Sequence, residues 1–382
     1  MALAAACMAG ALVAGCGPMT TGGGPDAAVG RAGAEGGRSV TVLGGGDLLI
    51  HPPVWKQARA DGGGEFDFRP MFDGIAPAVA GADLALCHLE VPLAGKKGPF
   101  SGWPAFKAPP QLLDGVERAG YDGCSTASNH VLDYGEKGVR RTLAAFDRAG
   151  LGAAGSARSA AEAAAPQVYR VRPDRGAPVE VAHLSSTVTF NGMERPPGKK
   201  WLANLADPEA IRAEARAAKD AGAEIVVLSM HWGTEYDHGV DDRQRELAAA
   251  LTGSPDIDVI LGHHAHVVQP VEKVRGTWVV YGMGNQLARH AAPVDANREG
   301  AMARVTFTET ASGRWRAEGL EMLPTRVDIE PKVRLVDLAT ALRDPRTPRR
   351  LRDDYAEAHA RITGHLTAHG APADGAVVAP AD

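Results

Sequence analysis

The stretch VILGHHAHVVQP, residues 259–270, places His263, His264 and His266 directly after a short apolar run. A run of this length is typical of a buried β-strand, and ligand-type residues at its end are typical of a site beyond a sheet edge. On an extended backbone, residues two apart point to the same side. We therefore expect His264 and His266 to converge on one point, with His263 facing the other way.

Similar apolar runs recur along the chain and alternate with helical patterns. The runs are VTVLG, ADLALC, EIVVLSM, DIDVIL and TWVVYG, and the helical patterns include residues 135–150 and 208–222. This alternation predicts an α/β domain whose strands are buried on both faces. Residues 302–327 change to a hairpin-like pattern, with ARVTFTET and RWRAEGLEML on either side of ASG.

Composition narrows the classes of function. The chain has 382 residues, of which 45% are hydrophobic, so it is long enough to bury a full core. Its 41 basic and 46 acidic residues give a net charge of -5. This even balance argues against nucleic acid as a partner, because a nucleic-acid binder shows a basic stripe.

The N-terminal segment MALAAACMAGALVAGCG is apolar, rich in small residues and too short to span a bilayer. It ends in VAGC, which resembles the lipobox of bacterial lipoproteins. We expect residues 1–16 to be a lipoprotein signal peptide, with Cys16 carrying the lipid and the protein held outside the cytoplasm at the cell membrane. The alternative is a secreted protein whose signal peptide is cleaved without lipidation.

The remaining chain divides by composition. Residues 17–38 are rich in Gly and Ala and predict a flexible tether, and residues 39–330 form the main domain. Residues 331–370 are predicted to be a helical extension, and residues 371–382 a disordered tail. Cys87 and Cys124 each end an apolar run, which leaves buried thiols and a disulfide as alternatives.

Residues of the types that ligate metal ions follow four of these apolar runs and the segment DGCSTAS, which we also read as a strand end. They are Asp47, Glu90, Asn129 with His130, His231, and His264 with His266. Singly, each has an ordinary explanation as a helix cap, a surface turn or a packed histidine. Ligands in open α/β sheets bind beyond the carboxyl ends of the strands, so agreement at five strand ends favours one shared crevice. The mixture of carboxylate, amide and imidazole groups, without cysteine, suits Mn, Fe or Zn.

Motifs in the same order identify a resemblance. GDLLIH, HLEVPL, SNHVLDYGEKG, TFNG, HWGTEY, GHHAHVVQPVE and YGMGNQL, spread over residues 40–290, resemble the CapA proteins of poly-γ-glutamate capsule biosynthesis. That family looks like a branch of the calcineurin-like metallophosphoesterase superfamily. The resemblance implies a four-layer α-β-β-α sandwich, and it makes residues 39–330 a metallophosphatase domain.

The resemblance also implies a role for each ligand-type residue. One metal ion would be held by Asp47 and His266, a second by Asn129, His231 and His264, and both by a bridging Glu90. Two such ions polarise a phosphoryl oxygen and activate water. His130 would act as general acid. Asp133 is spaced to orient the His130 imidazole, or it is a simple charge in the first turn of a helix.

Several positions depart from the superfamily pattern. Leu49 stands where a metal-binding histidine is usual, and His51 is a candidate to replace it. Glu90 stands in place of Asp, and His88 in place of the Asn that CapA proteins carry two residues earlier. A site with a single metal ion is therefore the alternative to a two-metal site.

Further residues are candidates for contact with substrate. The segment of residues 96–110 resembles a CapA loop and offers Trp103, Phe106 and Lys107 as an amphipathic wall. The motifs TFNG, HWGTEY and YGMGN contain further candidates. The full set of candidate substrate-binding residues is His51, Trp103, Lys107, Asn191, Glu235 and Asn285.

Two classes of function follow from the resemblance. The first is a lipid-tethered, metal-dependent hydrolase that acts on a phosphoester or on the amide backbone of poly-γ-glutamate. The second is a non-catalytic component that binds an anionic polymer and assists its export, alongside a membrane polyglutamate synthase or export components. His130 favours the first class, because a binding protein has no need of a general acid.

Overall fold

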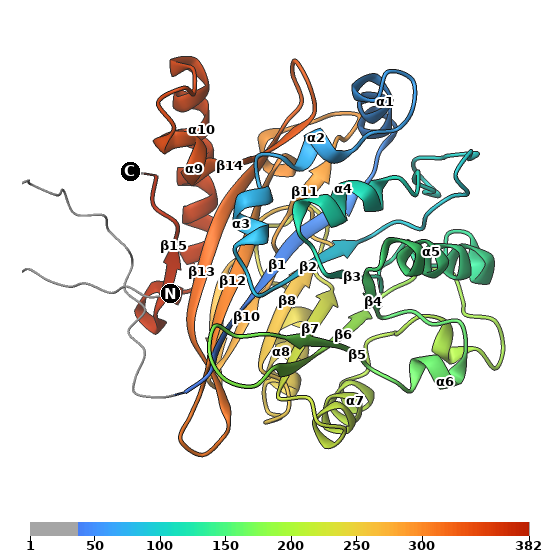
Figure 1. Cartoon of the computed structure of the whole chain (residues 1–382), viewed down its shortest axis with the longest axis vertical. Coiled ribbons are helices and arrows are strands. Elements are labelled where there is room, and N and C mark those ends of the chain that lie inside the picture. Colours follow the sequence, from blue (N-terminus) through green and yellow to red (C-terminus); the bar gives the residue numbers. More distant parts are fainter. Residues whose placement is uncertain (1–36, 382) are drawn as a thin grey trace, which may run out of the picture. The chain divides into compact units, whose positions relative to one another are not determined.

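The computed structural model describes residues 37–381, which belong to one compact unit. The predicted signal peptide with Cys16, and all but the last two residues of the predicted tether, lie outside the described residues. Two β-sheets pack face to face in this unit (Figure 1). Within the described residues, no helix combines the length and the apolar character needed to cross a membrane.

The larger sheet has nine strands. Its main path, in spatial order, is β14 (Arg334–Asp337), β13 (Trp315–Asp328), β12 (Glu299–Glu309), β1 (Ser39–Leu49), β2 (Leu84–Leu89), β3 (Gly123–Ser125) and β4 (Gly152–Ala154). Two short strands join it at the side: β11 (Asn285–Ala288) pairs with β1, and β15 (Ala376–Val378) pairs with β13. Strands β1 to β4 run parallel, so their carboxyl ends lie along one edge.

The smaller sheet has six strands. In spatial order they are β5 (Gln167–Val171), β6 (Val179–Thr187), β7 (Ile225–His231), β8 (Val259–His263), β10 (Thr277–Val280) and β9 (Val271–Val274). Strands β6, β7, β8 and β10 are parallel. The five predicted apolar runs form β7, β8 and β10 of this sheet and β1 and β2 of the larger sheet, whereas β6 is not among them.

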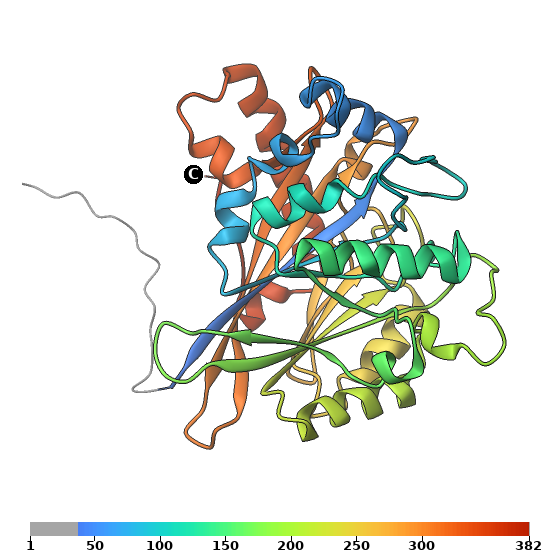
Figure 2. The ribbon, with the colours of Figure 1, turned by 45° about the vertical axis from the view of Figure 1, so that its right-hand side comes forward.

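Helices cover the outer faces of both sheets, as Figure 2 shows from a second direction. The larger sheet carries α1 (Pro52–Asp61), α2 (Arg69–Phe72), α3 (Ala76–Ala80), α4 (Leu112–Ala119) and α5 (Gly135–Ala149), and the smaller sheet carries α7 (Pro208–Asp220) and α8 (Asp242–Leu251). A third apolar cluster fills the space between the sheets. The four-layer α-β-β-α prediction is therefore confirmed.

Local sequence signals explain where the two predicted helices begin and end. Helix α7 begins at Pro208 directly after Asp207, whose side chain accepts a hydrogen bond from the Glu209 amide and so satisfies a free N–H of the first turn. Helix α5 ends at Gly150, which has the left-handed conformation that glycine adopts readily. Both helices match their predicted ranges to within two residues.

The hairpin predicted near residues 302–327 is confirmed, because β12 and β13 pair antiparallel. The C-terminal prediction needs correction. The residues after 330 contain, besides α9 (Leu338–Arg343) and α10 (Arg349–Thr367), the strand β14. The predicted disordered tail forms a short 3-10 helix, Ala371–Asp374, and β15, because Val377 and Val378 complete a ladder along β13.

Helix α10 extends the core rather than forming a separate appendage. Its buried residues Tyr355, Ala358 and Ile362 belong to the same apolar cluster as the inner face of β12 and β13. Figure 1 shows α10 beside these strands. The helix therefore covers apolar surface that would otherwise face water.

The two cysteines of the folded unit form a disulfide. Cys87 of β2 and Cys124 of β3 are register partners on neighbouring strands, with their Cα atoms 4.3 Å apart. The bond lies on the helix-covered face of the larger sheet, close to the strand ends that carry Glu90 and Asn129. Of the two alternatives open from the sequence, the structure has the disulfide.

Candidate metal centre

The strand ends bring the ligand-type residues together at one edge of the two sheets. Asp47 lies near the end of β1, and His231 and His263 are the last residues of β7 and β8. Glu90 directly follows β2, Asn129 lies in the loop after β3, and His264 and His266 lie in the loop after β8. All six candidate metal ligands are more than nine-tenths buried: Asp47, Glu90, Asn129, His231, His264 and His266. Parallel strands of both sheets thus point their ligands into a single centre, as the strand-end argument expects.

The histidine segment reaches this centre differently from the prediction. Strand β8 ends at His263, and both His264 and His266 have positive φ angles, 92° and 57°. Residues with side chains adopt this region only where the surroundings hold them there. The chain therefore does not stay extended, and His263 also turns inward, with its Nδ1 3.2 Å from Asp47 Oδ1. The prediction that His263 faces away is wrong.

Asp47 is held from two sides. Its amide donates to the Gly284 carbonyl at 2.9 Å, and a side chain on the preceding Gly46 would lie only 2.4 Å from that oxygen. This close approach explains the glycine before the aspartate. The carboxylate accepts a hydrogen bond from the His264 amide at 3.1 Å. Burial raises the pKa of Asp47, but hydrogen bonds from His263 and His266 outweigh burial and lower it.

Two overlapping groups of ligand atoms share Glu90. Asp47, Glu90 and His266 form one group, and Glu90, His231 and His264 form the other, with the ligand atoms of each group within 4.8 Å of one another. Asn129 joins the second group, because its Oδ1 lies 3.0 Å from His231 Nε2. This arrangement matches the two ligand sets that the resemblance implies, with Glu90 between them.

The state of Glu90 tests whether these residues fit a metal ion. Neither carboxylate oxygen of Glu90 has a hydrogen-bond partner, although both are buried. Its nearest basic atom is His266 Nε2 at 3.5 Å. Burial raises the pKa of Glu90 to about 7, with a smaller rise from the charge of Asp47. A buried carboxylate without donors is costly, and a bound cation removes that cost, so the donor set fits a divalent ion such as Mn, Fe or Zn.

Two of the three candidate ligand histidines, His231 and His264, are in the neutral state that metal ligation needs. Burial lowers the pKa of His231 well below its usual value and that of His264 to about 4, and neighbouring imidazoles lower both further. His264 Nδ1 is buried and has no hydrogen-bond partner. His266 differs, because the charges of Glu90 and Asp47 outweigh burial and raise its pKa to about 9. A bound cation would replace the proton at this ring.

His88 lies behind His231 in a chain of hydrogen bonds. Its Nε2 is 3.0 Å from His231 Nδ1, and its Nδ1 is 2.8 Å from Ser125 Oγ. If a metal ion were bound at His231 Nε2, it would need the lone pair of that atom, so His231 Nδ1 would carry the proton and donate a hydrogen bond to His88 Nε2. His88 Nδ1 then donates to Ser125, which leaves every nitrogen of the pair with one consistent role. His88 also lies in a candidate metal-binding group with Asp47 and His263. Because both of its ring nitrogens are engaged, by His231 and by Ser125, we assign it the role of positioning His231.

Replacing His88 is expected to weaken metal binding without removing a ligand. His88→Ala should raise the dissociation constant for Mn or Zn by about 10- to 100-fold, the usual effect of losing an outer partner of a ligating histidine. His88→Gln, whose amide oxygen can accept the same hydrogen bond, should recover part of the loss. Competition with a chromogenic chelator measures both variants. Equal affinity in wild type and His88→Ala would contradict the role assigned to His88.

His130 and Asp133 form a pair at the side of the centre. His130 Nδ1 lies 2.9 Å from Asp133 Oδ2, which also accepts the Phe106 amide at 2.6 Å. Burial lowers the pKa of His130, but the Asp133 hydrogen bond and the charge of Glu90 outweigh it, so the pKa is raised. Within the described chain, His130 belongs to none of the metal-type groups. The pair therefore suits proton transfer better than ligation.

The predicted substrate-binding residues near the 96–110 loop occupy different places. Phe106 packs edge-on against His130, with ring centroids 4.8 Å apart. Lys107 Nζ lies 4.0 Å from the centre of the Tyr134 ring, and Trp103 is 81% exposed. His51 is buried, with its Nδ1 3.0 Å from the Leu49 carbonyl oxygen, and it belongs to no metal-type group of the described residues. It therefore does not replace the histidine that Leu49 lacks.

Three more predicted substrate-binding residues lie at different distances from the candidate ligands. Glu235 is exposed and lies in a group with His264 and His266, so its carboxylate reaches the rim of the centre. Asn191 is exposed, and its backbone amide donates a hydrogen bond to Thr189 Oγ1 at 3.1 Å and not to a residue of the metal centre. Asn285 is fully buried, with its Oδ1 3.1 Å from His266 Nδ1. Asn285 thus orients His266, which corrects its predicted role in contacting substrate.

Sequence reasoning missed His290 and undervalued His88. His290 Nε2 lies 3.1 Å from Asn285 Nδ2, and burial lowers its pKa to about 3, with a smaller lowering from His51. No motif marks His290. His88 stands two residues before Glu90, and the period-2 rule for strands would have placed it on the same side.

The fold and the centre together define an α/β sandwich protein with a buried carboxylate and imidazole site suited to metal ions. Residues 41–290 match the family described as bacterial capsule synthesis protein PGA_cap, and the chain belongs to this family. The family resemblance seen in the sequence motifs is thereby confirmed.

Comparison with individual proteins gives the same result as the family match. The PGA biosynthesis protein CapA of Bacillus subtilis is 32% identical over 201 residues, covering 52% of this chain and 50% of the relative. The capsule biosynthesis protein CapA of Bacillus anthracis is 30% identical over 187 residues, covering 47% and 43%. The chain thus matches about half the length of these relatives. The calcineurin-like phosphoesterase YfkN from Bacillus subtilis has 13% identity and a TM-score of 0.49, over 86% of this chain and 98% of that one.

Proposed function

We propose that this protein is a metal-dependent hydrolase of the CapA type, which cleaves a phosphoester or the amide backbone of poly-γ-glutamate. The observation that carries the proposal is Glu90, a buried carboxylate without donors at the junction of two ligand groups. The names of the Bacillus relatives, a PGA biosynthesis protein and a capsule biosynthesis protein, support a role in making such a polymer. A non-catalytic polymer-binding component is the alternative that the experiments must separate.

The bound ions would polarise the scissile group and lower the pKa of a water molecule. Asp47, Glu90 and His266 would hold one ion, and Glu90, Asn129, His231 and His264 the other. His130 then holds a proton at Nε2, because Nδ1 is directed to Asp133. It delivers this proton to the leaving oxygen or nitrogen, while Phe106 at its side excludes water.

A direct assay tests the proposal. The full chain, loaded in turn with Mn, Fe and Zn, is incubated with bis-p-nitrophenyl phosphate and separately with poly-γ-glutamate. Release of nitrophenolate, or a fall in polymer size on a size-exclusion column, is expected with at least one metal. Binding of the polymer without cleavage under every loading would favour the non-catalytic alternative.

The pH dependence of activity should change in Asp133→Asn. The raised pKa of His130 depends on Asp133, so its removal lowers that pKa. A general acid must be protonated, and activity falls as pH rises through its pKa. The alkaline limb of the pH–rate profile should therefore move to lower pH, with turnover reduced by up to about 100-fold, less than when the imidazole itself is lost. An unmoved alkaline limb would show that Asp133 only shapes the loop.

We also propose that the protein is an extracytoplasmic lipoprotein anchored through Cys16, which lies outside the described residues. The disulfide between Cys87 and Cys124 supports this location, because such bonds persist in oxidising compartments.

Cys16→Ala should move the protein from the membrane fraction to the soluble fraction, because the residue that would carry the lipid is removed. Immunoblotting of fractionated cells measures the shift, and an inhibitor of lipoprotein processing should cause accumulation of the precursor. Wild-type protein found only in the soluble fraction would exclude the anchor, and would favour secretion instead.

A further inference from the structure

A second cavity lies away from the metal centre, at the side where the two sheets meet. Its volume is about 290 Å³. One wall comes from α5 and from the segment between β4 and α6 (Ala160–Ala163), and the other from β5, β6 and α7. Leu143, Phe146 and Leu151 supply an apolar side. None of the residues that line it is a ligand-type residue of the metal centre.

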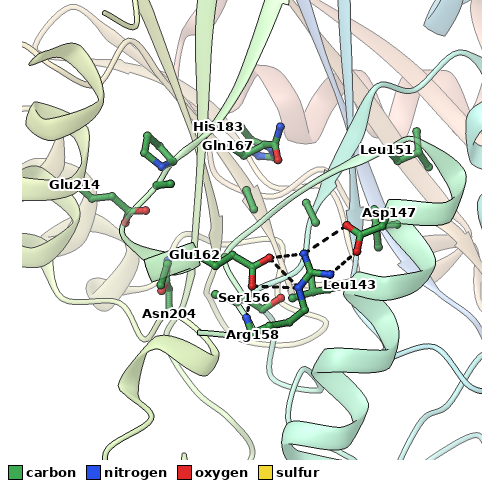
Figure 3. Close-up of a pocket in the computed structure, with 18 residues that line it drawn as sticks. Leu143, Asp147, Leu151, Ser156, Arg158, Glu162, Gln167, His183, Asn204 and Glu214 are labelled. Atoms are coloured by element: carbon green, nitrogen blue, oxygen red, sulfur yellow. Dashed lines mark hydrogen bonds and ion pairs between the residues drawn. The ribbon is translucent and has the colours of Figure 1, made fainter. Parts of the chain in front are cut away.

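The charged residues of this cavity leave one carboxylate without a partner. Arg158 lies between Asp147 and Glu162 and forms ion pairs with both, as Figure 3 shows. Glu214 of α7 lies on the opposite side of the cavity from Asp147. Within the described chain, no residue donates a hydrogen bond or forms an ion pair with Glu214. Three carboxylates against one guanidinium give the cavity a negative balance, which repels anions.

His183 adds a second polar group that has an unused atom. Its side chain is 1% exposed, its Nε2 lies 2.9 Å from Ser229 Oγ, and its Nδ1 has no hydrogen-bond partner. Burial lowers the pKa of His183 to about 3, with a smaller lowering from His263, so the ring is neutral. Buried polar atoms in native proteins are nearly always satisfied, by protein, water or ligand. His183 is one of the residues that line the cavity, so its unsatisfied Nδ1 is a second sign that a ligand or water belongs in this region.

We propose that this cavity binds a short aliphatic molecule carrying an ammonium group, which pairs with the Glu214 carboxylate. The apolar side formed by Leu143, Phe146 and Leu151 would contact the aliphatic part. A bare metal ion fits less well, because Glu214 and His183 belong to no metal-type group of the described residues. The volume is near the lower end of the range for small-molecule sites, which limits the ligand to a small molecule.

The environment of Glu214 agrees with this ligand. Burial raises the pKa of Glu214 to about 7. An ammonium group beside the carboxylate would favour its charged form and lower that pKa. Binding near neutral pH should therefore release a proton, which no structural role of Glu214 would produce.

Titration calorimetry of the full chain with putrescine tests the site, with butanediol as the neutral molecule of the same length. Putrescine should bind with a dissociation constant of about 1 mM or lower, and butanediol should not bind measurably. Glu214→Gln should weaken putrescine binding by about 10- to 100-fold, the effect of losing a charged hydrogen-bond partner. Glu246→Gln, an exposed glutamate of α8 outside the cavity, serves as the matched control and should bind as wild type does.

Proton release gives a second readout that needs no variant. Near pH 7, the wild-type chain should release about half a proton per putrescine bound, and near pH 9 almost none, because Glu214 is then already ionised. Calorimetry in buffers of different ionisation enthalpy measures this number. Absence of saturable putrescine binding, equal affinity in Glu214→Gln and wild type, or equal binding of butanediol would each overturn the proposal.

Discussion

His130→Asn should lower turnover by about 10²- to 10⁴-fold, the usual contribution of one positioned proton donor, while leaving the metal content unchanged. The structure explains why turnover should fall while the metal content stays unchanged. His130 belongs to none of the metal-type groups among the described residues, and its Nδ1 is engaged by Asp133. Asparagine keeps a polar side chain of smaller size but cannot donate a proton as an acid. Steady-state kinetics and metal analysis of the same preparation measure both quantities.

A matched control shows whether the loss of any histidine, and not of His130 in particular, changes turnover or metal content. His369→Asn changes an exposed histidine beyond the end of α10 and should leave both turnover and metal content as in wild type. A contrary result would be equal inactivity of wild type and His130→Asn on every substrate, with both still supporting polymer production in cells. The non-catalytic polymer-binding function would then replace the hydrolase.

The ligand positions at strand ends could be predicted because they depend on topology alone. Asp47, Glu90 and His231 follow or end apolar runs, and parallel strands necessarily bring such ends to one edge. The alternation of strand and helix patterns predicts an α/β domain with strands buried on both faces, and the family resemblance adds the four-layer arrangement. These features need no knowledge of side-chain conformation.

Other features depend on the backbone leaving its regular path, which periodicity does not reveal. His264 and His266 have positive φ angles, so the alternation rule placed His263 wrongly. The sequence predicts Asn285 as a residue that contacts substrate, yet it is the register partner of Asp47 on β1 and is fully buried. The tail beyond residue 370 looked disordered, because its pairing along β13 joins segments far apart in the chain.

His231→Ala and His264→Ala should each lose metal and activity together. Each removes an imidazole from the group that contains Glu90, and His231 also holds Asn129 Oδ1 at 3.0 Å. Because loss of an outer partner alone costs about 10- to 100-fold in affinity, loss of a ligating imidazole should cost at least about 100-fold. Elemental analysis after reconstitution with Mn, Fe and Zn measures the occupancy. Turnover on the substrate found for wild type should fall in parallel.

Comparing the metal loss of His231→Ala with that of His88→Ala shows whether the loss comes from removing a ligand or from disturbed packing. His88 is as fully buried as His231 and contacts it, so both alanine variants open a similar space in the protein. If metal loss came only from disturbed packing, the two variants would lose metal equally. A larger loss in His231→Ala than in His88→Ala, with similar melting temperatures for the metal-free proteins, would assign the difference to ligation. Wild-type occupancy below about a tenth of an equivalent after reconstitution would contradict the metal centre itself, since a site with this donor set should bind far more.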